Sequence, residues 1–277
     1  MKKSILITGC SSGIGLDSAL TLQKRGWQVF AACRKQEDAV RLRQDYGLTT
    51  MVLDYEDEAS IEAALAEVLS QTGGRLDALF NNGAYAIPGA VEDLPTDALR
   101  TIFEANFFGW HHLTRAVLPI MRAQGHGRIL QNSSVLGFAA MRYRGAYNAT
   151  KFALEGLTDT LRLELKNTNI ELILIEPGPI RTKIRENSYP HFQKWIDAEN
   201  GAHKVVYRKA LIPRLTAVNP PRDSFELMPD AVSKDVVHAL EADRPKLRYR
   251  VTWATTFMMI FKRLLPTRLL DKIAIRF

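Results

Sequence analysis

Long apolar runs are absent from this sequence of 277 residues, in which 46% of the residues are hydrophobic and 24% are charged. Because a membrane-spanning helix needs about 20 consecutive apolar residues, the sequence predicts no spanning segment. The apolar stretch 4–8 follows two lysines, as in a signal peptide, but it is shorter than the roughly seven residues that such a signal requires. We therefore expect a cytoplasmic protein whose first β-strand begins near Ser4.

Cysteine is scarce, and the chain has only Cys10 and Cys33. Two cysteines are too few for a disulfide framework. Both stand where neighbouring parallel strands are expected to end, and such strands lie about 4.8 Å apart. Two interpretations stay open, namely small packing residues and a thiol pair capable of redox chemistry.

Patterns typical of metal sites are also lacking. His111 and His112 are adjacent on an expected helix, so their side chains point in different directions and make a poor pair of ligands. We therefore expect no metal site.

Positive charge is unevenly distributed along the chain, whose formal net charge is +7. The segment 241–277 contains nine lysine or arginine residues and three acidic residues, which gives it a net charge of +6. A nucleic-acid-binding protein places its basic groups around the binding site, whereas the excess here is terminal. The sequence therefore favours a function without nucleic acid.

Strand and helix patterns alternate along most of the chain. Apolar segments typical of buried strands lie between segments with the apolar spacing of amphipathic helices. The expected strands are 4–8, 27–33, 50–54, 76–81, 127–134 and 170–176. Such alternation is typical of a parallel sheet. We predict an α/β fold with a single domain over 1–277, a doubly wound Rossmann-type parallel sheet with helices on both faces.

The segment 177–229 interrupts this alternation. It contains seven of the twelve prolines, and its aromatic residues lie among basic ones. A long irregular segment beyond the carboxyl end of a strand commonly covers a binding site. We expect 177–229 to form a lid over the substrate, followed by a helix near 229–243 and a short strand near 247–251.

A glycine-rich loop joins the first strand to the first helix. Gly9, Gly13 and Gly15 let backbone N–H groups approach a pyrophosphate, which the helix N-terminus also favours. The second strand ends in Cys33-Arg34, where an NAD-binding domain would place an acidic residue for the ribose. Since Arg34 can pair with a 2′-phosphate, we expect NADP(H) as the cofactor. The alternative is that Arg34 is simply solvated.

A serine, a tyrosine and a lysine form the most informative pattern. Tyr147 and Lys151 are four residues apart in an expected helix and hence share one face, and Ser134 ends the preceding strand. A tyrosine has an ordinary pKa of about 10, which a neighbouring ammonium lowers. Tyr147 can then exchange a proton with an alcohol or carbonyl oxygen that Ser134 holds in place. The alternative is a buried tyrosine and a surface lysine at helical spacing.

These motifs occur in an order that resembles the short-chain dehydrogenase/reductase family. The resemblance covers 4–182 and rests on the glycine loop, Asn81-Asn82, Asn106, Ser134, Tyr147, Lys151 and Pro177-Gly178. The downstream half resembles the branch with 17β-hydroxysteroid and retinol dehydrogenases and bacterial NADP-dependent aldehyde reductases. The resemblance implies that Asn106, Ser134, Tyr147 and Lys151 form a catalytic tetrad. In it Tyr147 is the general acid or base, Lys151 also binds the nicotinamide ribose, and Asn106 holds a water that links Lys151 to solvent. From its aromatic neighbours alone, Asn106 would be a satisfied core amide.

The resemblance also implies which residues contact the cofactor. In the family, Gly9, Ser12 and Ile14 match positions at the pyrophosphate, Asp54 matches one at the adenine, and Ile180 and Thr182 match positions at the carboxamide. The expected contacts are Gly9, Ser11, Ser12, Gly13, Ile14, Arg34, Asp54, Asn81, Gly83, Tyr147, Lys151, Pro177, Gly178, Ile180 and Thr182. One departure is Gly83-Ala84, where the family usually has alanine before glycine, so a β-carbon stands where a glycine conformation is expected.

We therefore expect an NADP(H)-dependent oxidoreductase that interconverts a carbonyl and an alcohol by hydride transfer, with Tyr147 as acid or base. The alternative is a catalytically silent NADP-binding regulator or scaffold. We expect an apolar substrate pocket for an aldehyde or ketone, formed by Tyr85, Ile87, Leu136, Phe138, Met141 and Tyr143. The alternative is that half of these residues belong to the core. Arg142 and Arg144 would meet an anionic group or face water. We expect a homo-oligomer, either a dimer or a tetramer.

The tail 252–277 combines apolar and basic residues. Its apolar side chains begin at Trp253 and are interrupted at Pro266, with lysine and arginine between them. Two short amphipathic helices of this kind can lie on an anionic membrane surface. They can equally cover the substrate pocket or form a subunit contact, so all three interpretations stay open.

Overall fold

The computed structural model describes residues 2–218 and 221–275 and contains a seven-stranded sheet in the order β3-β2-β1-β4-β5-β6-β7. All neighbouring strands are parallel. The strands are β1 (Ser4–Ile7), β2 (Gln28–Cys33), β3 (Thr49–Val52), β4 (Ala78–Asn81), β5 (Gly127–Asn132), β6 (Ile170–Glu176) and β7 (Arg248–Arg250). The order reverses between β1 and β4, and such a point is where open α/β sheets bind ligands, beyond the carboxyl ends of the strands.

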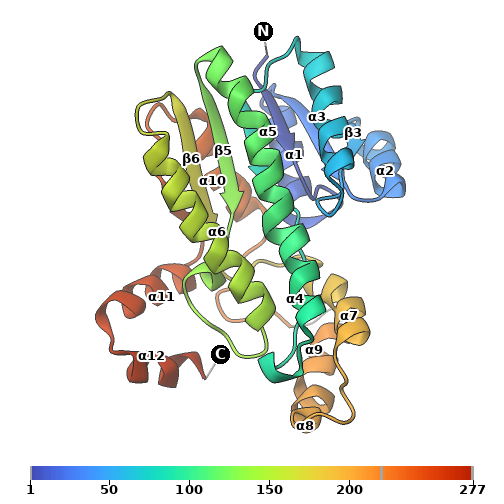
Figure 1. Cartoon of the computed structure of the whole chain (residues 1–277), viewed down its shortest axis with the longest axis vertical. Coiled ribbons are helices and arrows are strands. Elements are labelled where there is room, and N and C mark those ends of the chain that lie inside the picture. Colours follow the sequence, from blue (N-terminus) through green and yellow to red (C-terminus); the bar gives the residue numbers. More distant parts are fainter. Residues whose placement is uncertain (1, 219–220, 276–277) are drawn as a thin grey trace.

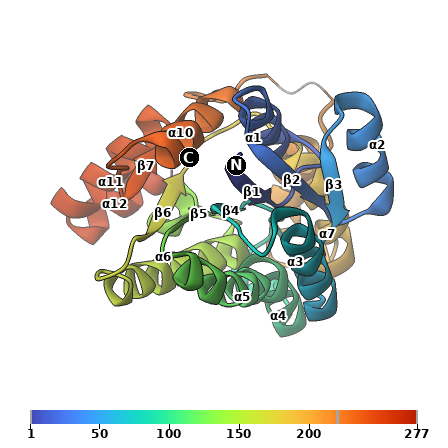
Figure 2. The ribbon, with the colours of Figure 1, turned by 90° about the horizontal axis from the view of Figure 1, so that it is seen from above.

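Helices cover both faces of the sheet, as Figure 2 shows from above. One face carries α1 (Gly13–Lys24) and α10 (Asp230–Glu241), with α2 (Gln36–Tyr46) near the β3 edge. The other face carries α3 (Glu58–Thr72), α5 (Gly109–Gln124) and α6 (Gly145–Glu164). The short α4 (Thr96–Phe103) precedes α5. The structure confirms the predicted doubly wound fold.

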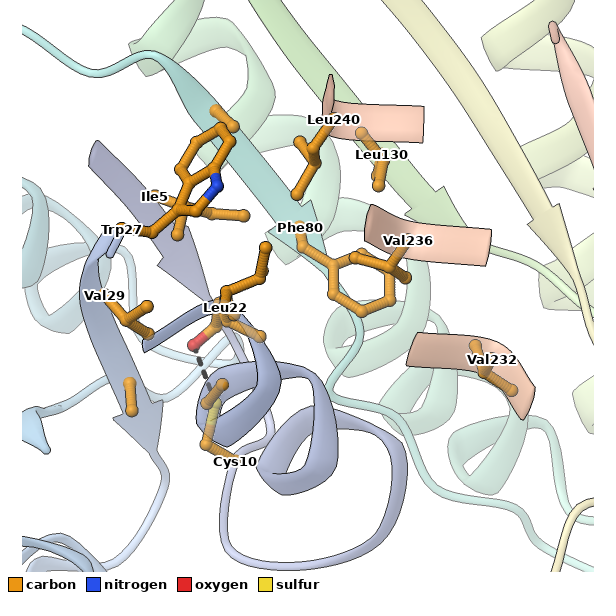
Figure 3. Close-up of a cluster of buried hydrophobic side chains, with 14 of the residues drawn as sticks. Ile5, Cys10, Leu22, Trp27, Val29, Phe80, Leu130, Val232, Val236 and Leu240 are labelled. Atoms are coloured by element: carbon orange, nitrogen blue, oxygen red, sulfur yellow. Dashed lines mark hydrogen bonds between the residues drawn. The ribbon is translucent and has the colours of Figure 1, made fainter. Parts of the chain in front are cut away.

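Side-chain alternation in the strands divides the core into two halves. In β1, Ile5 and Ile7 pack toward α1 and α10, whereas Leu6 packs toward α3 and α5. Figure 3 shows part of the first half, where Phe80 of β4 lies beside Val236 of α10. All four residues of β1 are buried, as expected for a parallel strand covered on both faces. Burial of one such large apolar side chain contributes about 1.5–3 kcal/mol.

The segment 177–229 contains several helices, so it is more regular than the sequence suggested. It contains α7 (Ile184–Trp195), α8 (Lys204–Val206), a π-helical turn (Tyr207–Leu211) and α9 (Ile212–Thr216). Pro177 and Pro179 precede α7, whereas Pro190 lies inside it. Pro213 lies in the continuous helical run formed by α8, the π-helical turn and α9. Phe192, Tyr207 and their apolar neighbours give these helices a core of their own. We call α7–α9 the helical lobe (Figure 1).

The tail forms two short helices after β7, as predicted. They are α11 (Trp253–Leu264) and α12 (Thr267–Ala274), and Pro266 separates them. Figure 1 shows both at the margin of the molecule, on the opposite side from the helical lobe. Within 2–218 and 221–275, none of the helices has the length and apolar character needed to cross a membrane.

Candidate active site

The glycine-rich loop after β1 leaves little room for side chains at its glycine positions. Gly9 and Gly13 have φ angles of +65° and +58°, which favour glycine. A Cβ on Gly9 would lie 2.5 Å from Gly83 Cα, and one on Gly15 would lie 2.4 Å from the Gly9 carbonyl oxygen. Ser12, the N-cap residue of α1, forms no capping hydrogen bond with its side chain. The first N–H groups of α1 therefore suit an anion at this helix N-terminus.

Asn82 holds the glycine loop in place. Its Nδ2 donates to the carbonyl oxygens of Thr8 at 2.9 Å and of Gly9 at 3.3 Å, and its Oδ1 accepts from Asn132 Nδ2 at 2.8 Å. The loop, the end of β4 and the end of β5 are thereby joined. The sequence analysis missed these roles of Asn82 and Asn132, although the Asn81-Asn82 pair at a strand end was a usable signal.

The side chain of Asn81 is part of the core, and its contact with the cofactor stays a prediction. It is fully buried, its Oδ1 accepts from Tyr55 Oη at 2.7 Å, and its Nδ2 donates to Thr114 Oγ1 and Gln131 Oε1. Because its amide is engaged inside the core, the Asn81 side chain supports the strand end.

The Gly83-Ala84 exchange creates no strain at residue 84. Among the residues that the structure describes, only Tyr143 and Phe225 combine a side chain with a positive φ angle. Ala84 therefore does not need the conformation that glycine favours. Gly83 occupies the position next to Gly9, where the two backbones are in close contact.

The residues expected at the adenosine end of the cofactor follow β2 and β3. Arg34 is exposed and forms no ion pair with the described residues. Asp54, after β3, is half-buried, and its Oδ1 accepts from the Glu56 N–H at 3.0 Å. Arg41, which was not predicted, donates from Nη2 to the Ser11 carbonyl oxygen at 2.8 Å and to Asp38 at 2.9 Å. It thus fixes the glycine loop from the side of α2.

The turn after β6 brings its residues to the same edge of the sheet. A Cβ on Gly13 would lie 3.0 Å from Thr182 Cγ2, so Thr182 is adjacent to the glycine loop. Ile180 pairs with Leu227 through a β-bridge. At Gly178, a Cβ would lie 2.0 Å from Thr252 Oγ1. Glycine is therefore required there by the start of the tail, and the Pro177 carbonyl oxygen accepts from the Val135 N–H at 2.8 Å.

Lys151 lies inside the molecule, which rules out the surface lysine of the alternative interpretation. It is 1% exposed, and its Nζ donates to the Asn132 carbonyl oxygen at 2.7 Å. The same Nζ lies 4.1 Å from the ring centroid of Trp110 and 5.6 Å from that of Tyr147. Burial lowers the pKa of the Lys151 ammonium to about 7, and the negative charge of Glu155 opposes this shift.

Ser134 and Tyr147 come together, as predicted. Ser134 follows β5, and its Oγ accepts from the Leu136 N–H at 3.1 Å, which fixes the hydroxyl. Burial raises the pKa of the Tyr147 hydroxyl, and a hydrogen bond with Ser134 offsets only part of this increase. The net shift of the Tyr147 pKa is therefore upward and not downward as expected, because burial dominates. At neutral pH Tyr147 keeps its proton, and Lys151 is close to its own titration point.

Asn106 lies in a π-helical turn, Glu104–Phe108, between α4 and α5. Its Oδ1 accepts from the Tyr85 N–H at 3.1 Å, and its Nδ2 donates to the Tyr85 carbonyl oxygen at 2.8 Å. The side chain is therefore the satisfied core amide expected from its neighbours. Such π-turns often occur at functional sites, and this one packs against α6, which carries Tyr147.

Cys10 and Cys33 are both free and buried. Burial raises the pKa of the Cys10 thiol well above its usual value and that of Cys33 to about 12. Because the thiolate is the reactive form, these pKa values favour the packing interpretation over redox chemistry.

The residues predicted to line a substrate pocket differ in their burial. Tyr85 and Ile87 are buried, and the Tyr85 ring stacks on His191 of α7 with 4.0 Å between ring centroids. Leu136, Phe138, Met141 and Tyr143 are half-buried. Arg142 is exposed, whereas burial and the positive charges of Arg214 and Arg185 lower the pKa of Arg144 to about 10.

Comparison with known proteins gives the family. The family model described as short chain dehydrogenase matches residues 3–192. YbbO, an uncharacterized oxidoreductase of Escherichia coli strain K12, is 41% identical over 273 residues, covering 99% of this chain and 94% of the relative. The NADPH-dependent 3-dehydrocapnine reductase of Ornithobacterium rhinotracheale is 31% identical over 277 residues, with coverages of 97% and 94%.

Retinol dehydrogenase 8 of Bos taurus is 31% identical over 274 residues, covering 96% of this chain and 86% of the relative. This likeness agrees with the resemblance of the downstream half to the retinol dehydrogenase branch. The chain is therefore an oxidoreductase of the short-chain dehydrogenase/reductase family.

Proposed function

We propose that this protein is an NADP(H)-dependent oxidoreductase that interconverts a carbonyl and an alcohol. The observation that supports this most is the buried ammonium of Lys151, one helical turn from Tyr147, whose hydroxyl is hydrogen-bonded to Ser134. A lysine is rarely buried without a task or a partner, and perturbed ionisable groups cluster at functional sites.

The glycine loop fits a dinucleotide. Gly9, Gly13 and Gly15 leave a cradle that a Cβ would fill, at the N-terminus of α1. We infer that this loop and Ser11, Ser12 and Ile14 hold the pyrophosphate, and that Thr182 and Ile180 hold the nicotinamide end. The nicotinamide supplies or accepts the hydride when the cofactor is bound.

Proton transfer is assigned to the chain's own side chains. We infer that Ser134 holds the substrate oxygen and that Tyr147 gives it a proton in reduction or takes one in oxidation. The raised pKa of Tyr147 keeps the hydroxyl protonated before transfer. The positive charge of Lys151 then stabilises the phenolate. In this scheme Asn106 holds the loop after β4 through its two hydrogen bonds with the Tyr85 backbone. It also holds the water that links Lys151 to solvent.

Arg34 supports NADP over NAD. The second strand ends in the neutral Cys33, and the exposed Arg34 that follows can pair with a 2′-phosphate. The name of one relative, the NADPH-dependent 3-dehydrocapnine reductase, points the same way. We further propose an apolar aldehyde or ketone as the substrate, because the half-buried Leu136, Phe138 and Met141 follow closely after Ser134 in the chain. Cytoplasmic location and assembly into a dimer or tetramer stay predictions.

The test of the proposed function is the Tyr147→Phe variant, which keeps the ring and removes the hydroxyl. NADPH oxidation is measured with a panel of aldehydes, ketosteroids and retinal. General acid–base groups contribute about 10²–10⁴ in rate, so turnover should fall by at least that range while NADPH binding, measured by fluorescence, persists.

The matched control is Tyr46→Phe, which changes a tyrosine exposed on α2 and should leave turnover intact. Turnover of a well-folded Tyr147→Phe within a few-fold of the wild type would remove Tyr147 from this role. If the wild type binds NADPH but reduces none of the carbonyls, the silent NADP-binding alternative gains support.

A further inference from the structure

Several large apolar side chains of α11 and α12 face solvent. Trp253 is 72% exposed and Leu264 is 75% exposed, and Phe257, Ile260 and Leu269 are exposed as well. Within the described residues of these two helices, only Thr255 is buried. A surface helix normally turns its apolar stripe toward the core, and the half-buried Phe261 and Ile273 do so. The exposed apolar residues are additional to that stripe, and the described residues leave them uncovered.

Polar contacts fix this orientation. Lys262 Nζ donates to the Phe138 carbonyl oxygen and lies 4.7 Å from the Phe152 ring centroid. Arg142 Nη2 donates to the Ile275 carbonyl oxygen at 2.9 Å, at the far end of α12. Thr252 caps α11 by accepting from the Thr255 N–H at 3.3 Å. Polar groups therefore help to hold the helices to the body, while part of their apolar surface stays exposed.

Basic residues surround this apolar face. Lys262, Arg263, Arg268 and Lys272 are all exposed, and Asp271 is the single acidic residue of α11 and α12. If the face packed against the same face of a second copy, these positive charges would be brought together and would repel one another. An anionic lipid surface offers both the apolar interior and the negative charge that this face lacks.

We propose that α11 and α12 bind the surface of an anionic membrane, with Trp253, Phe257 and Leu264 inserted at the headgroup boundary and the basic residues Arg263, Arg268 and Lys272 on lipid phosphates. Helices that lie in the interface combine apolar burial with attraction to anionic lipid in this way. Attachment of this kind needs no spanning segment, and it does not depend on the proposed catalytic function.

The test uses the full chain with two kinds of vesicle, one of phosphatidylcholine alone and one that also contains phosphatidylglycerol. We expect the protein to co-sediment with the anionic vesicles at low salt and to be released as salt screens the charges. Trp253 dominates the response to lipid, because Trp27 and Trp110 are buried and Trp195, in α7, is half-buried. Its emission should shift to the blue and be quenched by lipids brominated in their acyl chains, and Trp253→Phe should lose most of that quenching.

Variants separate the apolar from the electrostatic contribution. Trp253→Ser/Leu264→Ser and Arg263→Gln/Arg268→Gln should each weaken vesicle binding about tenfold or more, a loss equal to about 1.4 kcal/mol. The matched controls are Leu163→Ser, which changes a residue 71% exposed on α6, and Lys24→Gln/Lys209→Gln, which removes two exposed charges elsewhere. Both controls should bind vesicles as the wild type does.

Three results would overturn the proposal. The full chain could stay in the supernatant with anionic vesicles at low salt. The tail variants could also bind anionic vesicles as strongly as their controls do. Finally, light scattering could show an oligomer that Trp253→Ser/Leu264→Ser dissociates, in which case a second copy covers the face. Failure of the proposed enzyme function is distinct, since it is measured as loss of carbonyl turnover without vesicles.

Discussion

The charge of Lys151 depends on Glu155, the residue one helical turn further along α6. Glu155 is 8% exposed and forms an ion pair with Arg248 of β7, and its Oε1 is buried without a hydrogen-bond partner. Burial lowers the pKa of Lys151, and the negative charge of Glu155 raises it, to give a value of about 7. Glu155 is therefore placed to hold a proton on Lys151 without touching the reacting atoms.

Replacement of Glu155 by glutamine should shift the pH dependence of turnover. Without the carboxylate the pKa of Lys151 falls below about 7, so fewer molecules carry the ammonium at neutral pH. A nearby opposite charge shifts a pKa by about one unit or more. The basic limb of the profile of kcat against pH for carbonyl reduction should therefore move about one unit lower, with activity recovered near pH 6.

Asp159→Asn is the control for this shift, because Asp159 lies one turn further on the same helix face. It also pairs with Arg248, at 2.6 Å, but is far more exposed than Glu155. The basic limb of the profile of kcat against pH should be the same in Asp159→Asn as in the wild type. Equal shifts in both variants, or none in Glu155→Gln, would show that Glu155 does not set the charge of Lys151.

Arg34 is the residue on which cofactor preference should depend. Charged hydrogen bonds contribute about 1.5–3 kcal/mol each, so a pair between Arg34 and the 2′-phosphate favours NADP about tenfold to a hundredfold. Arg34→Asp reverses the local charge and should shift the ratio of the dissociation constants for NADP and NAD toward NAD by at least tenfold. Titration of protein fluorescence with each nucleotide gives this ratio.

Lys24→Asp serves as the comparison, because it changes the net charge equally at an exposed residue at the end of α1. It should leave the nucleotide preference where it was. An unchanged ratio in Arg34→Asp places the phosphate contact on another residue.

The helix spacing of Tyr147 and Lys151 was predictable from the sequence, but their environment was not. The four-residue interval fixes a shared face, whereas the burial of Lys151 depends on Trp110 and the carbonyl group of Asn132, which belong to other elements. Similarly, Asn81 and Asn82 have the same side chain, and only strand alternation decides that one enters the core and the other holds the glycine loop.

At the scale of elements, local patterns predicted the regular strands and helices well. The predicted strand 170–176 coincides with β6, because its apolar residues are bounded by polar ones. The π-turn at Glu104–Phe108 was not predictable, since one extra residue in a helix leaves no mark in an apolar stripe. Proline content was a poor guide to the helical lobe, because Pro190 lies inside α7, where its missing N–H removes one helical hydrogen bond without ending the helix.

The helical lobe should depend on Tyr207, which is fully buried. Its hydroxyl accepts from the Ala90 N–H at 2.9 Å and donates to the Asp93 carboxylate. Tyr207→Phe leaves both groups without this partner, and an unsatisfied buried group costs about 1–3 kcal/mol. We expect a loss of that size in the free energy of unfolding, measured with denaturant, together with faster amide exchange in α7–α9.

Tyr189→Phe is the comparison within the same lobe, because this ring is only half-buried beside Phe192. Its effect on unfolding should be below that of Tyr207→Phe. If both variants unfold like the wild type, the lobe does not depend on the Tyr207 hydroxyl.

For the whole molecule, alternation of strands and helices was enough to predict the doubly wound sheet. It could not indicate which distant segments meet beyond the strand ends. The contact between Gly178 and Thr252 joins the turn after β6 to the start of the tail. Arg248 joins β7 to α6 through Glu155 and Asp159. These contacts span long intervals of sequence and depend on complementary shape and charge, which no local pattern records.

The bond from Lys262 to the Phe138 carbonyl group joins α11 to the turn that begins at Ser134. Any ligand that shifts one end of this connection biases the other, and thermodynamic linkage makes the effect reciprocal. If attachment of α11 and α12 tightens the hold on the nucleotide by a given factor, the nucleotide tightens attachment by the same factor. The fraction of the protein bound to a lipid surface would then depend on the concentration of reduced cofactor. Membrane attachment would thus follow the redox state of the surroundings.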